Sequence, residues 1–399
     1  MHCGRGLVGA SSRLRVHTHR RALSSIATGG SLTDVCERLG ARFVLFSWCD
    51  LFGTVRSKMV PASKASPMAE DGAGFAGFAA NMDMEPSEPD ILATPDQSKL
   101  VLLPWNREVA FVPCDLTVSG REGPLLQSPR YALKAALAEL REKHGLILKT
   151  GVELEFHLLE AFPGGKLADP TDKAAKPCYA AEPLMRQAGF IQSLLTNMED
   201  LGWDPYQADH EDSNGQFELN WKYSEALETA DRHFLYKYMV RSMAEARGMQ
   251  ATFMPKPFVD LTGNSCHVHI SLHRESDGAN VFDRDAEGTT ASSTHPFGLS
   301  DVAMHFVAGI LHHAPGLTAI SNPTVNSFKR INAPPPSSGA TWSPSTVSWT
   351  GNNRTHMVRV PDAPRFEFRL SDSAANPYLL PAAILAAGKD GIDKVGGDP

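Results

Sequence analysis

Four segments of the chain alternate apolar and polar residues with a period of two, and this pattern limits the fold more than any other feature. Successive side chains of a β-strand point to opposite faces of its sheet. In VELEFH (152–157), the apolar residues occupy one face, and Glu153, Glu155 and His157 occupy the other. The same alternation recurs in three further segments: QFELNW (216–221), HVHISL (267–272) and RFEFRL (365–370). We expect four strands whose apolar faces pack on helices and whose polar faces line a common cleft.

The polar faces of these segments carry carboxylates, imidazoles and guanidiniums. A single strand of this kind is usually the solvent-facing side of a surface sheet, but such strands favour Thr, Lys and Ser. Clustered carboxylates repel one another and raise each other's pKa unless cations neutralise them. Hard divalent cations, Mg²⁺ or Mn²⁺, with two or more ions in the site, would do so. The ligand set that the residues suggest is Glu153, Glu155, Glu211, Glu218, Glu367 and His267.

Arginines gather near the C-terminus, beside the polar, proline-rich segment 332–353. They are Arg330, Arg354, Arg359, Arg365 and Arg369. A guanidinium group is a planar fork that fits carboxylate and phosphate oxygens. Metals combined with arginines are typical of phosphoryl transfer, which depends on positioning and charge neutralisation. The chain has no P-loop motif, so ATP would be held by metals and arginines instead. A loop as long as 332–353 is usually a functional lid or disordered.

The order of the expected elements indicates an α+β chain with two domains. Residues 34–120 read as a small β-rich domain, with a hairpin at 43–60 and a long, partly mobile connection at 62–98. Strands are also expected at 100–105 and 109–116. The catalytic domain is expected at 125–399 and begins with a helix from Ser128 to about His144. Its further elements are strand 146–159, helix 183–201, strand 203–221, helix 224–247, strands 251–254 and 265–273, and helix 298–314.

Charge and cysteine content exclude several classes of protein. The net charge of -7 gives no reason to expect a nucleic acid or an anionic membrane as a partner. No apolar run approaches the roughly 20 residues of a membrane-spanning helix. The six cysteines include no C-x-x-C pair, which argues against a disulfide framework or a zinc site.

The first 33 residues differ from the rest of the chain. They are rich in Arg and Ser and contain no acidic residue. This composition is typical of an organelle transit peptide, so we expect a mitochondrial or plastid matrix location. The alternative is a disordered basic tail on a cytoplasmic protein.

Six blocks in order resemble the signature blocks of glutamine synthetases, across about 34–395. They are GVELEFHLLE, HEDSNGQFELNW, GNSCHVHISL, NPTVNSFKRI, NNRTHMVRVP and RFEFRLSDSAANPYLL. The segment 329–361 is most similar to the type III group, which includes glutamate–methylamine ligases. The resemblance implies an N-terminal β-grasp domain and a catalytic half-barrel of antiparallel strands with outer helices. It also implies a homo-oligomer of stacked rings with active sites between subunits.

The resemblance further implies a role for each matched residue. Glutamate would be bound by Gly263, Arg330 and Arg369, and ATP by Ser271, Arg354, Arg359 and Arg365. One metal would be held by Glu155, Glu211 and Glu218, and the metal on the ATP phosphates by Glu153, His267 and Glu367. The amine site would comprise Asp50 from a neighbouring subunit with Asp90 and Tyr179. The expected catalytic residues are Asp50, Arg354 and Arg369.

For four of these positions a structural role is an alternative. Asp50 precedes a glycine turn and could hold it. Tyr179 could be a packed aromatic residue. His210 and His269 read as hydrogen-bonding core histidines more readily than as ligands.

The expected reaction has two steps. The γ-carboxylate of glutamate attacks the γ-phosphate of ATP, and an amine deprotonated beside Asp50 then displaces phosphate from the γ-glutamyl phosphate. Ammonia-using relatives carry a lid glutamate at the position of Pro336, which has no charge and no backbone N–H. Trp342 and Trp349 offer faces for an alkylated ammonium instead, so methylamine is favoured as acceptor. The tryptophans could also merely pack the closed lid.

Three other functions remain open. They are a plain glutamine synthetase serving nitrogen metabolism and glutamine biosynthesis, a two-metal hydrolase, and a structural pseudoenzyme. A pseudoenzyme should have lost metal ligands, whereas all six matched positions retain ligating residues. Relatives usually continue for several dozen residues beyond the NPYL block, so we expect a C-terminally shortened catalytic domain.

Overall fold

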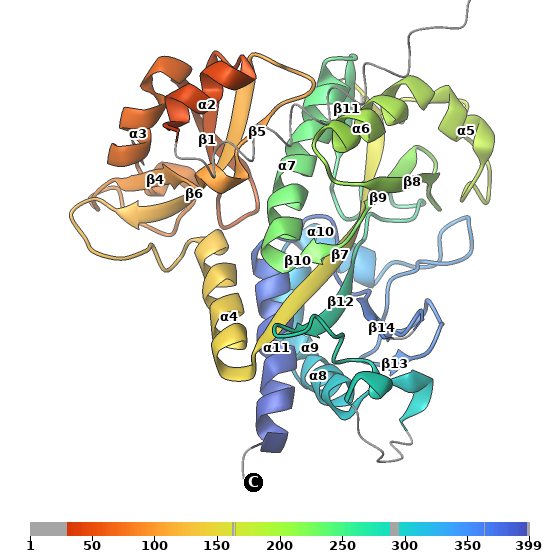
Figure 1. Cartoon of the computed structure of the whole chain (residues 1–399). Coiled ribbons are helices and arrows are strands. Elements are labelled where there is room, and N and C mark those ends of the chain that lie inside the picture. The colour runs from red at the N-terminus through yellow and green to blue at the C-terminus, as the bar shows by residue number, and fades with distance from the viewer. Residues whose placement is uncertain (1–29, 162, 164, 288–294, 363, 397–399) are drawn as a thin grey trace, which may run out of the picture. The chain divides into compact units, whose positions relative to one another are not determined.

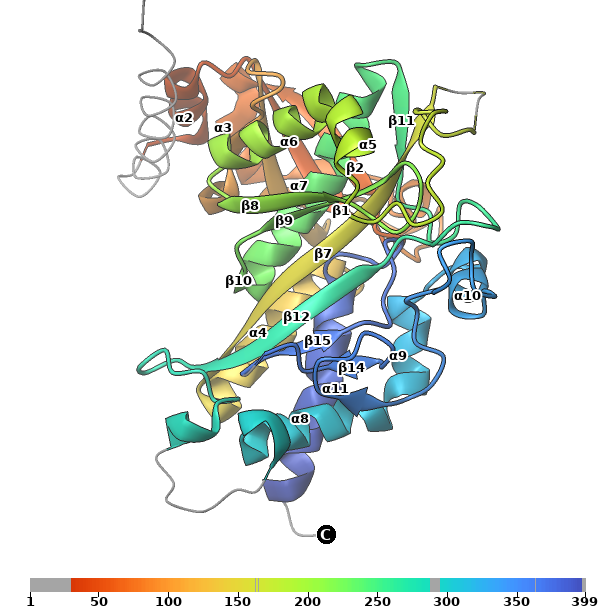
Figure 2. The same ribbon diagram turned by 90° about the vertical axis from the view of Figure 1, so that its right-hand side faces the viewer.

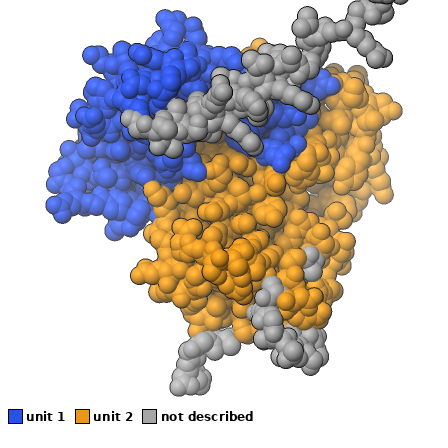
Figure 3. All heavy atoms as spheres, viewed as in Figure 1, with its two compact units in different colours: residues 1–131, 192–205 blue, residues 132–191, 206–399 orange. Residues whose placement is uncertain are grey.

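The computed structural model describes residues 30–161, 163, 165–287, 295–362 and 364–396. The chain divides into two compact units (Figure 3). Unit 1 contains the described residues up to Tyr131 together with Gln192–Pro205, and unit 2 contains Ala132–Ile191 and the chain from Tyr206 onward. The expected α+β class is confirmed.

Unit 1 is built on one mixed sheet. Its strands follow the order β2 (Val55–Pro61), β1 (Phe43–Cys49), β6 (Val109–Val118), β4 (Ile91–Pro95) and β3 (Ala73–Phe75), and β5 (Val101–Leu102) also pairs with β6. β1 and β2 form the expected antiparallel hairpin, whereas β1 and β6 are parallel. Buried side chains of the sheet and of helices α2 (Leu32–Leu39) and α3 (Ala65–Asp71) form the core of this unit.

Two expectations for unit 1 are corrected. The segment 62–98 is not a loose connection, because it contains α3, β3 and β4, and its small residues pack tightly. At Gly77, for example, an added Cβ would lie 2.5 Å from the sulfur of Met84. The expected tail 1–33 also overlaps α2, whose capping box joins Ser31 and Asp34. The remainder of the expected transit peptide lies outside the described residues.

Unit 2 is built on a larger sheet around two long strands. The order is β13 (Trp349–Thr350), β14 (Val358–Arg359), β15 (Phe366–Phe368), β12 (Cys266–Arg274), β7 (Leu146–Glu160), β9 (Gln216–Trp221) and β8 (Pro205–His210). β10 (Ser224–Glu225) and β11 (Met249–Thr252) also pair with β7. β7 and β12 run side by side as the longest strands (Figure 2). Their pairing is antiparallel, as expected, while the short β13–β14 pair is parallel.

Helices accompany this sheet. They are α4 (Pro129–His144), α5 (Ala181–Arg186), α7 (Ala226–Glu245), α8 (Asp301–His312), α9 (Ala314–Ser321), α10 (Val325–Ile331) and α11 (Leu379–Gly396). Helix α6 (Ala188–Asp200) begins in unit 2, but its residues from Gln192 onward belong to unit 1. α7 packs on β7, and α11 packs on α8 and α9 (Figure 1). The α8–α11 contact is close, because a Cβ at Gly309 would lie 2.1 Å from the carbonyl oxygen of Ala387. Among the residues that the structure describes, short 3₁₀ helices lie at Ala62–Lys64, Phe78–Ala80, Gln97–Lys99, Arg284–Glu287 and Pro296–Gly298.

Several elements differ from the sequence expectations. The expected helix 183–201 is two helices, and the expected strand 203–221 is two strands joined by a turn at 211–215. The helices α9, α10 and α11 were not expected. None of the helices in the described ranges is both long and apolar enough to span a bilayer.

Candidate active site

The strand registers of unit 2 bring the polar faces together as the alternation predicts. Glu155 of β7 lies opposite Glu218 of β9, and Glu153 of β7 lies opposite His267 of β12. On the other side of β12, His269 lies opposite Glu367 of β15. Directly opposed residues have Cβ atoms about 4.5–5.5 Å apart. The sheet itself therefore assembles the cluster from four strands far apart in the sequence.

One carboxylate cluster consists of Glu155, Glu211 and Glu218. Each offers an oxygen, and these oxygens lie within 4.8 Å of one another. Burial, together with the charges of neighbouring glutamates, raises the pKa of Glu211 and of Glu218 well above the usual value. In the described part of the chain, no arginine or lysine makes an ion pair with these three residues. The cluster therefore lacks cationic compensation from the protein itself.

The carboxylate of Glu155 is held by neutral donors. It accepts hydrogen bonds from the backbone N–H of Ser265 at 2.7 Å and from Nε2 of Gln216 at 2.8 Å. Oγ of Ser265 donates a further bond to its other oxygen. These contacts fix the orientation of Glu155 and leave its charge in place.

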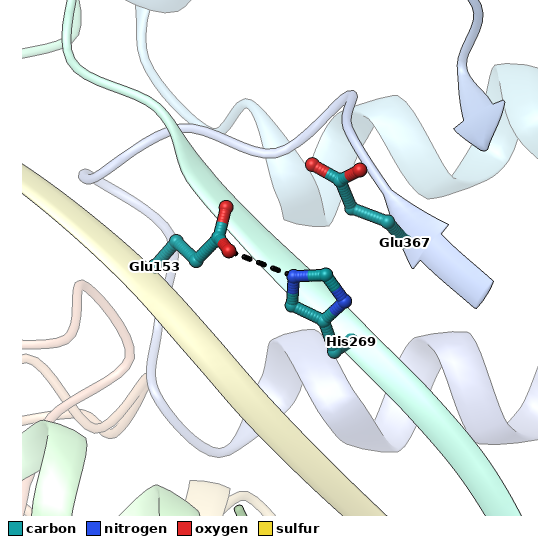
Figure 4. A group of neighbouring side chains, drawn as sticks. All are labelled: Glu153, His269 and Glu367. Carbon is teal, nitrogen blue, oxygen red and sulfur yellow. Dashed lines mark hydrogen bonds and ion pairs between the residues drawn. The ribbon is translucent and has the colours of Figure 1, made fainter. Parts of the chain in front are cut away.

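The second cluster combines carboxylates with imidazoles (Figure 4). Glu153, His269 and Glu367 offer ligand atoms within 4.8 Å of one another, and His269 Nε2 lies 2.8 Å from Glu153 Oε1. The expected ligand His267 is also present, with Nδ1 3.4 Å from Glu153 and 3.5 Å from Glu367. His269, which the sequence suggested was a core histidine, thus contacts the same carboxylate as His267.

Cationic groups compensate the second cluster. Although burial opposes ionisation, hydrogen bonds from His267 and His269 hold the pKa of Glu153 well below its usual range. Burial would also raise the pKa of Glu367, but the charges of His267 and Arg369 outweigh burial and lower this pKa. Arg359 Nη1 lies 2.6 Å from Glu367, and Arg369 also pairs with this carboxylate.

Both clusters fit divalent metal ions. Carboxylate oxygens are the ligands that Mg²⁺ and Mn²⁺ prefer, and imidazole makes a site slightly softer. His267 Nε2 is buried with no hydrogen-bond partner among the described residues. Burial and the charge of Arg369 lower the pKa of His267, which favours the neutral ring that can bind a metal.

All the carboxylates of the two clusters, together with His267 but not His269, line one cleft of about 670 Å³ in unit 2. Its volume is typical of a small-molecule site. Expected site residues that line the cleft are Glu153, Glu155, Tyr179, Glu211, Glu218, Gly263, His267, Arg330, Arg354, Arg359, Glu367 and Arg369. The structure therefore brings most of the expected set together.

The arginines enter the cleft from fixed positions. Arg330 is 3% exposed and donates from Nη1 to the carbonyl oxygen of Leu370 at 3.1 Å. Arg369 Nε donates to the carbonyl oxygen of Arg354 at 3.1 Å. Gly263 packs against Arg330, and a Cβ there would lie 2.2 Å from the carbonyl oxygen of Pro255. A larger residue at 263 would displace the Arg330 side chain.

Four expected site residues are not among those that line the cleft. Ser271 faces His273 Nε2 at 3.1 Å, and Arg365 pairs with Asp362 at 2.8 Å near the surface. Asp50 and Asp90 belong to unit 1. Their expected roles remain predictions.

Asp50 is fully buried within unit 1. Its Oδ1 accepts hydrogen bonds from the backbone N–H groups of Phe52 and Thr54, at 3.0 and 2.8 Å. Its Oδ2 accepts from Arg56 Nε at 3.0 Å and from Asn81 Nδ2 at 3.3 Å. The carboxylate thus holds the turn between β1 and β2, which is the structural alternative considered from the sequence.

The sequence analysis missed some residues of the cleft. Asp209 and Asp212 both line it. Gln207, Asp209 and Glu211 follow one another at intervals of two residues. The alternation of polar and apolar residues that predicted the other strands could therefore have identified Asp209. Of the two loop tryptophans, Trp342 lines the cleft, whereas the Trp349 ring meets Phe297 edge to face at 6.1 Å.

An α+β fold with two acidic clusters that could hold metal ions, and with arginines in one cleft, is typical of metal-dependent enzymes that act on anionic substrates. The comparisons make this more specific. The family model described as glutamine synthetase, catalytic domain, matches residues 126–396. This chain belongs to the glutamine synthetase family, and the expected enzyme class, a glutamate–amine ligase of that family, is confirmed.

Relatives with two different names are similar to this chain. A glutamine synthetase from Rhizobium leguminosarum bv. phaseoli is 52% identical over 88% of this chain and 78% of its own length. A glutamate–methylamine ligase from Methyloversatilis universalis is 40% identical over 88% of this chain and 77% of its own length. A solved structure of a GmaS/ADP complex is 52% identical, with a TM-score of 0.85, and covers 91% of this chain and 81% of its own.

Proposed function

We propose that this protein joins a small alkylamine, with methylamine favoured, to the γ-carboxylate of glutamate at the expense of ATP, through γ-glutamyl phosphate. The observation that carries this proposal is the pairing of two metal-fitting clusters with Arg330, Arg359 and Arg369 in a single cleft. A reaction between two anions, glutamate and ATP, needs this concentration of positive charge.

The protein groups act by binding and orienting the reactants. Glu155, Glu211 and Glu218 would hold one metal, and Glu153, Glu367 and an imidazole would hold another. Such metals neutralise phosphate and carboxylate charge when bound. Arg330 would bind the α-carboxylate of glutamate, and Arg369 would face the γ-carboxylate. Arg354 and Arg359 would contact the phosphates, with Arg365 and Ser271 on the nucleotide side.

The acceptor preference rests on the loop residues of the cleft. Trp342 and Tyr179 both line the cleft, and Pro336 carries no charge. An aromatic face attracts an alkylated ammonium with about 0.5–2 kcal/mol, which corresponds to a several-fold to tens-fold preference. The similarity to GmaS and to a glutamate–methylamine ligase supports the same choice.

A plain glutamine synthetase is the second candidate. It is favoured by the names of two relatives from Rhizobium species that are 52% and 50% identical to this chain. Ammonium competing with methylamine at equal concentration and pH distinguishes the two functions. We expect a higher kcat/KM for methylamine. If ammonium exceeds every alkylamine tested, the protein is a glutamine synthetase and the argument from Pro336 is wrong.

A two-metal hydrolase would release ADP whether or not glutamate is present. Phosphate release from ATP should therefore be measured with and without glutamate, across a panel of amines. We expect release only when glutamate is present, and a pseudoenzyme would show none in any condition.

Three further features belong to this proposal. Asp50 serves as the base for the amine in a neighbouring subunit, with Asp90 and Tyr179 beside the amine. The subunits assemble into rings, which mass photometry would test. The first 33 residues direct the protein to an organelle matrix, which fusion of this segment to a fluorescent protein would test.

A replacement of Asp50 by asparagine separates its two roles. The amide keeps an oxygen that can accept from the turn, but it cannot take a proton. We expect kcat to fall about 100-fold, within the range for removal of a general base. The melting temperature should also fall, because the amide nitrogen cannot accept from Arg56 and Asn81. Equal losses of activity and stability would assign Asp50 to the turn alone.

A further inference from the structure

The loop 332–348 is attached to the cleft at one carboxylate oxygen. Three donors converge on Oδ2 of Asp212: Thr262 Oγ1 at 3.1 Å, Ser338 Oγ at 2.6 Å and Trp342 Nε1 at 2.6 Å. Two of the three donors belong to the loop. We call these four residues the Asp212 latch. A charge-assisted hydrogen bond is about twice as strong as a neutral one, so this oxygen is a firm anchor for a loop without regular structure.

The latch is adjacent to the metal-fitting cluster. Asp212 is 8% exposed, and its backbone N–H donates to Oε2 of Glu211 at 3.1 Å. The same residue therefore contacts a ligand carboxylate through its main chain and the loop through its side chain. The loop and the ligand carboxylate of Glu211 are therefore joined through one residue.

Trp342 adopts an unusual backbone conformation to make its contact. Its φ is +55°, which bulky side chains rarely adopt. Such a conformation persists only where the surroundings stabilise it, and it is enriched at functional sites. Trp342 also lines the cleft, whereas Trp349 on the same segment does not.

We propose that Asp212 is a positioning residue that fixes the loop 332–348 over the cleft through Trp342 and Ser338, so that the activated acyl phosphate reacts with the amine and not with water. This inference rests on the proposed ligase function and deepens it. The Asp212 latch takes no part in bond making or breaking. It changes how the γ-glutamyl phosphate divides between reaction with the amine and reaction with water.

The two fates of the intermediate leave different products. When the amine attacks the acyl carbon, the C–O bond to phosphate breaks, and amide, phosphate and a proton are formed. When water attacks the same carbon, glutamate is regenerated and phosphate is again released. Each event consumes one ATP, so the ratio of phosphate to amide measures the leak directly.

The test compares two tryptophan replacements at saturating glutamate, amine and Mg²⁺. Trp342→Phe keeps an aromatic ring in the cleft but removes the N–H donor, and Trp349→Phe is the matched control on the same segment. We expect phosphate and amide to remain equimolar in the unsubstituted protein and in Trp349→Phe. In Trp342→Phe the ratio should rise several-fold, and in Ser338→Ala by less. Equimolar products from Trp342→Phe would overturn the proposal.

A second measurement needs no turnover. Amide hydrogen exchange across 336–343 should be several-fold faster in Trp342→Phe and Asp212→Asn than in Trp349→Phe, in the full-length protein without substrates. Unchanged exchange would show that the latch does not hold the loop. Faster exchange in these variants would support the loop anchor even if no form of the protein released phosphate in the presence of glutamate and an amine. That second result would contradict the proposed ligase function and not the anchor.

Discussion

The two acidic clusters of the cleft differ in how the protein compensates their charge. Within the described ranges, Glu155, Glu211 and Glu218 have only neutral hydrogen-bond donors, and the pKa values of Glu211 and Glu218 are raised. Glu153 and Glu367 contact imidazoles and guanidiniums, and their pKa values are lowered. The raised pKa values of Glu211 and Glu218 disfavour their carboxylates unless a cation binds, whereas the lowered pKa values of Glu153 and Glu367 favour their carboxylates. Both clusters are buried, so burial does not explain why the pKa values are raised in one cluster and lowered in the other.

The largest expected effect is the loss of turnover when a ligand of the uncompensated cluster is replaced. Glu218→Gln keeps the shape of the side chain but removes its charge. Replacement of groups that only support metal ligands costs 10–100-fold, so we expect a loss of at least about 100-fold in kcat/KM for ATP. Steady-state kinetics at limiting Mg²⁺ would measure it. Near-normal activity would remove Glu218 from the ligand set.

The second effect concerns stability in the absence and presence of metal. A metal that binds only the folded state stabilises it by about 2.7 kcal/mol at 100 times its Kd. We expect Glu218→Gln to raise the melting temperature of the metal-free protein, because repulsion with Glu155 and Glu211 is relieved, and to remove most of the increase that Mg²⁺ produces. Glu153→Gln should instead lower the metal-free melting temperature. The imidazoles of His267 and His269, in a cluster that also contains the guanidinium groups paired with Glu367, would lose the anion of Glu153. Equal behaviour of the two variants would contradict the comparison.

The third effect is a pH dependence of opposite sign in the two clusters. Since the folded pKa of Glu218 lies above 4.5, its favourable contribution to stability is present below that value and is lost as pH rises through the raised pKa. Since the folded pKa of Glu153 lies below 4.5, its contribution is present above that value and is lost as pH falls through the lowered pKa. Melting temperatures of the two Gln variants and the unsubstituted protein, metal-free over a pH range that extends well below 4 and up to 8, would show both slopes.

The smallest effect distinguishes the two histidines of the compensated cluster. Among the described residues, both rings have one buried nitrogen without a hydrogen-bond partner, Nε2 of His267 and Nδ1 of His269. His267 lines the cleft, whereas His269 does not and contacts Glu153 through Nε2 at 2.8 Å. We expect His269→Gln to weaken metal binding by about tenfold, as for a group that orients a ligand, and His267→Gln to weaken it further. Isothermal titration with Mn²⁺ would rank them. The reverse order would make His269 the ligand.

The alternation of polar and apolar residues was enough to predict which side chains share the cleft. It fixes the face on which Glu153, Glu155, Glu218 and Glu367 lie, and the observed registers then set them opposite one another. Helix α4 was also predictable, because a Ser-Pro start and Gly145, with its φ of +62°, mark its ends.

Other features depend on contacts that the local sequence does not encode. The elements α3, β3 and β4 escaped prediction because they are short and lie among Gly and Pro residues, so close packing decides their conformation. The Asp212 latch joins residues separated by 50, 126 and 130 positions. Nothing near Asp212 in the sequence indicates which loop reaches it, and the separate fates of Trp342 and Trp349 are likewise decided by tertiary contacts.

The placement of ligands on alternate residues of paired strands has a consequence for how this molecule can change during evolution. A single inserted or deleted residue within β7 would turn Glu153 and Glu155 away from His267 and Glu218, toward the apolar side. An insertion of two residues would return Glu153 and Glu155 to their original face of the sheet but would pair them with different residues of β9 and β12. Substitutions can therefore accumulate in β7, β9 and β12, while changes of their length are tolerated only in the connecting turns.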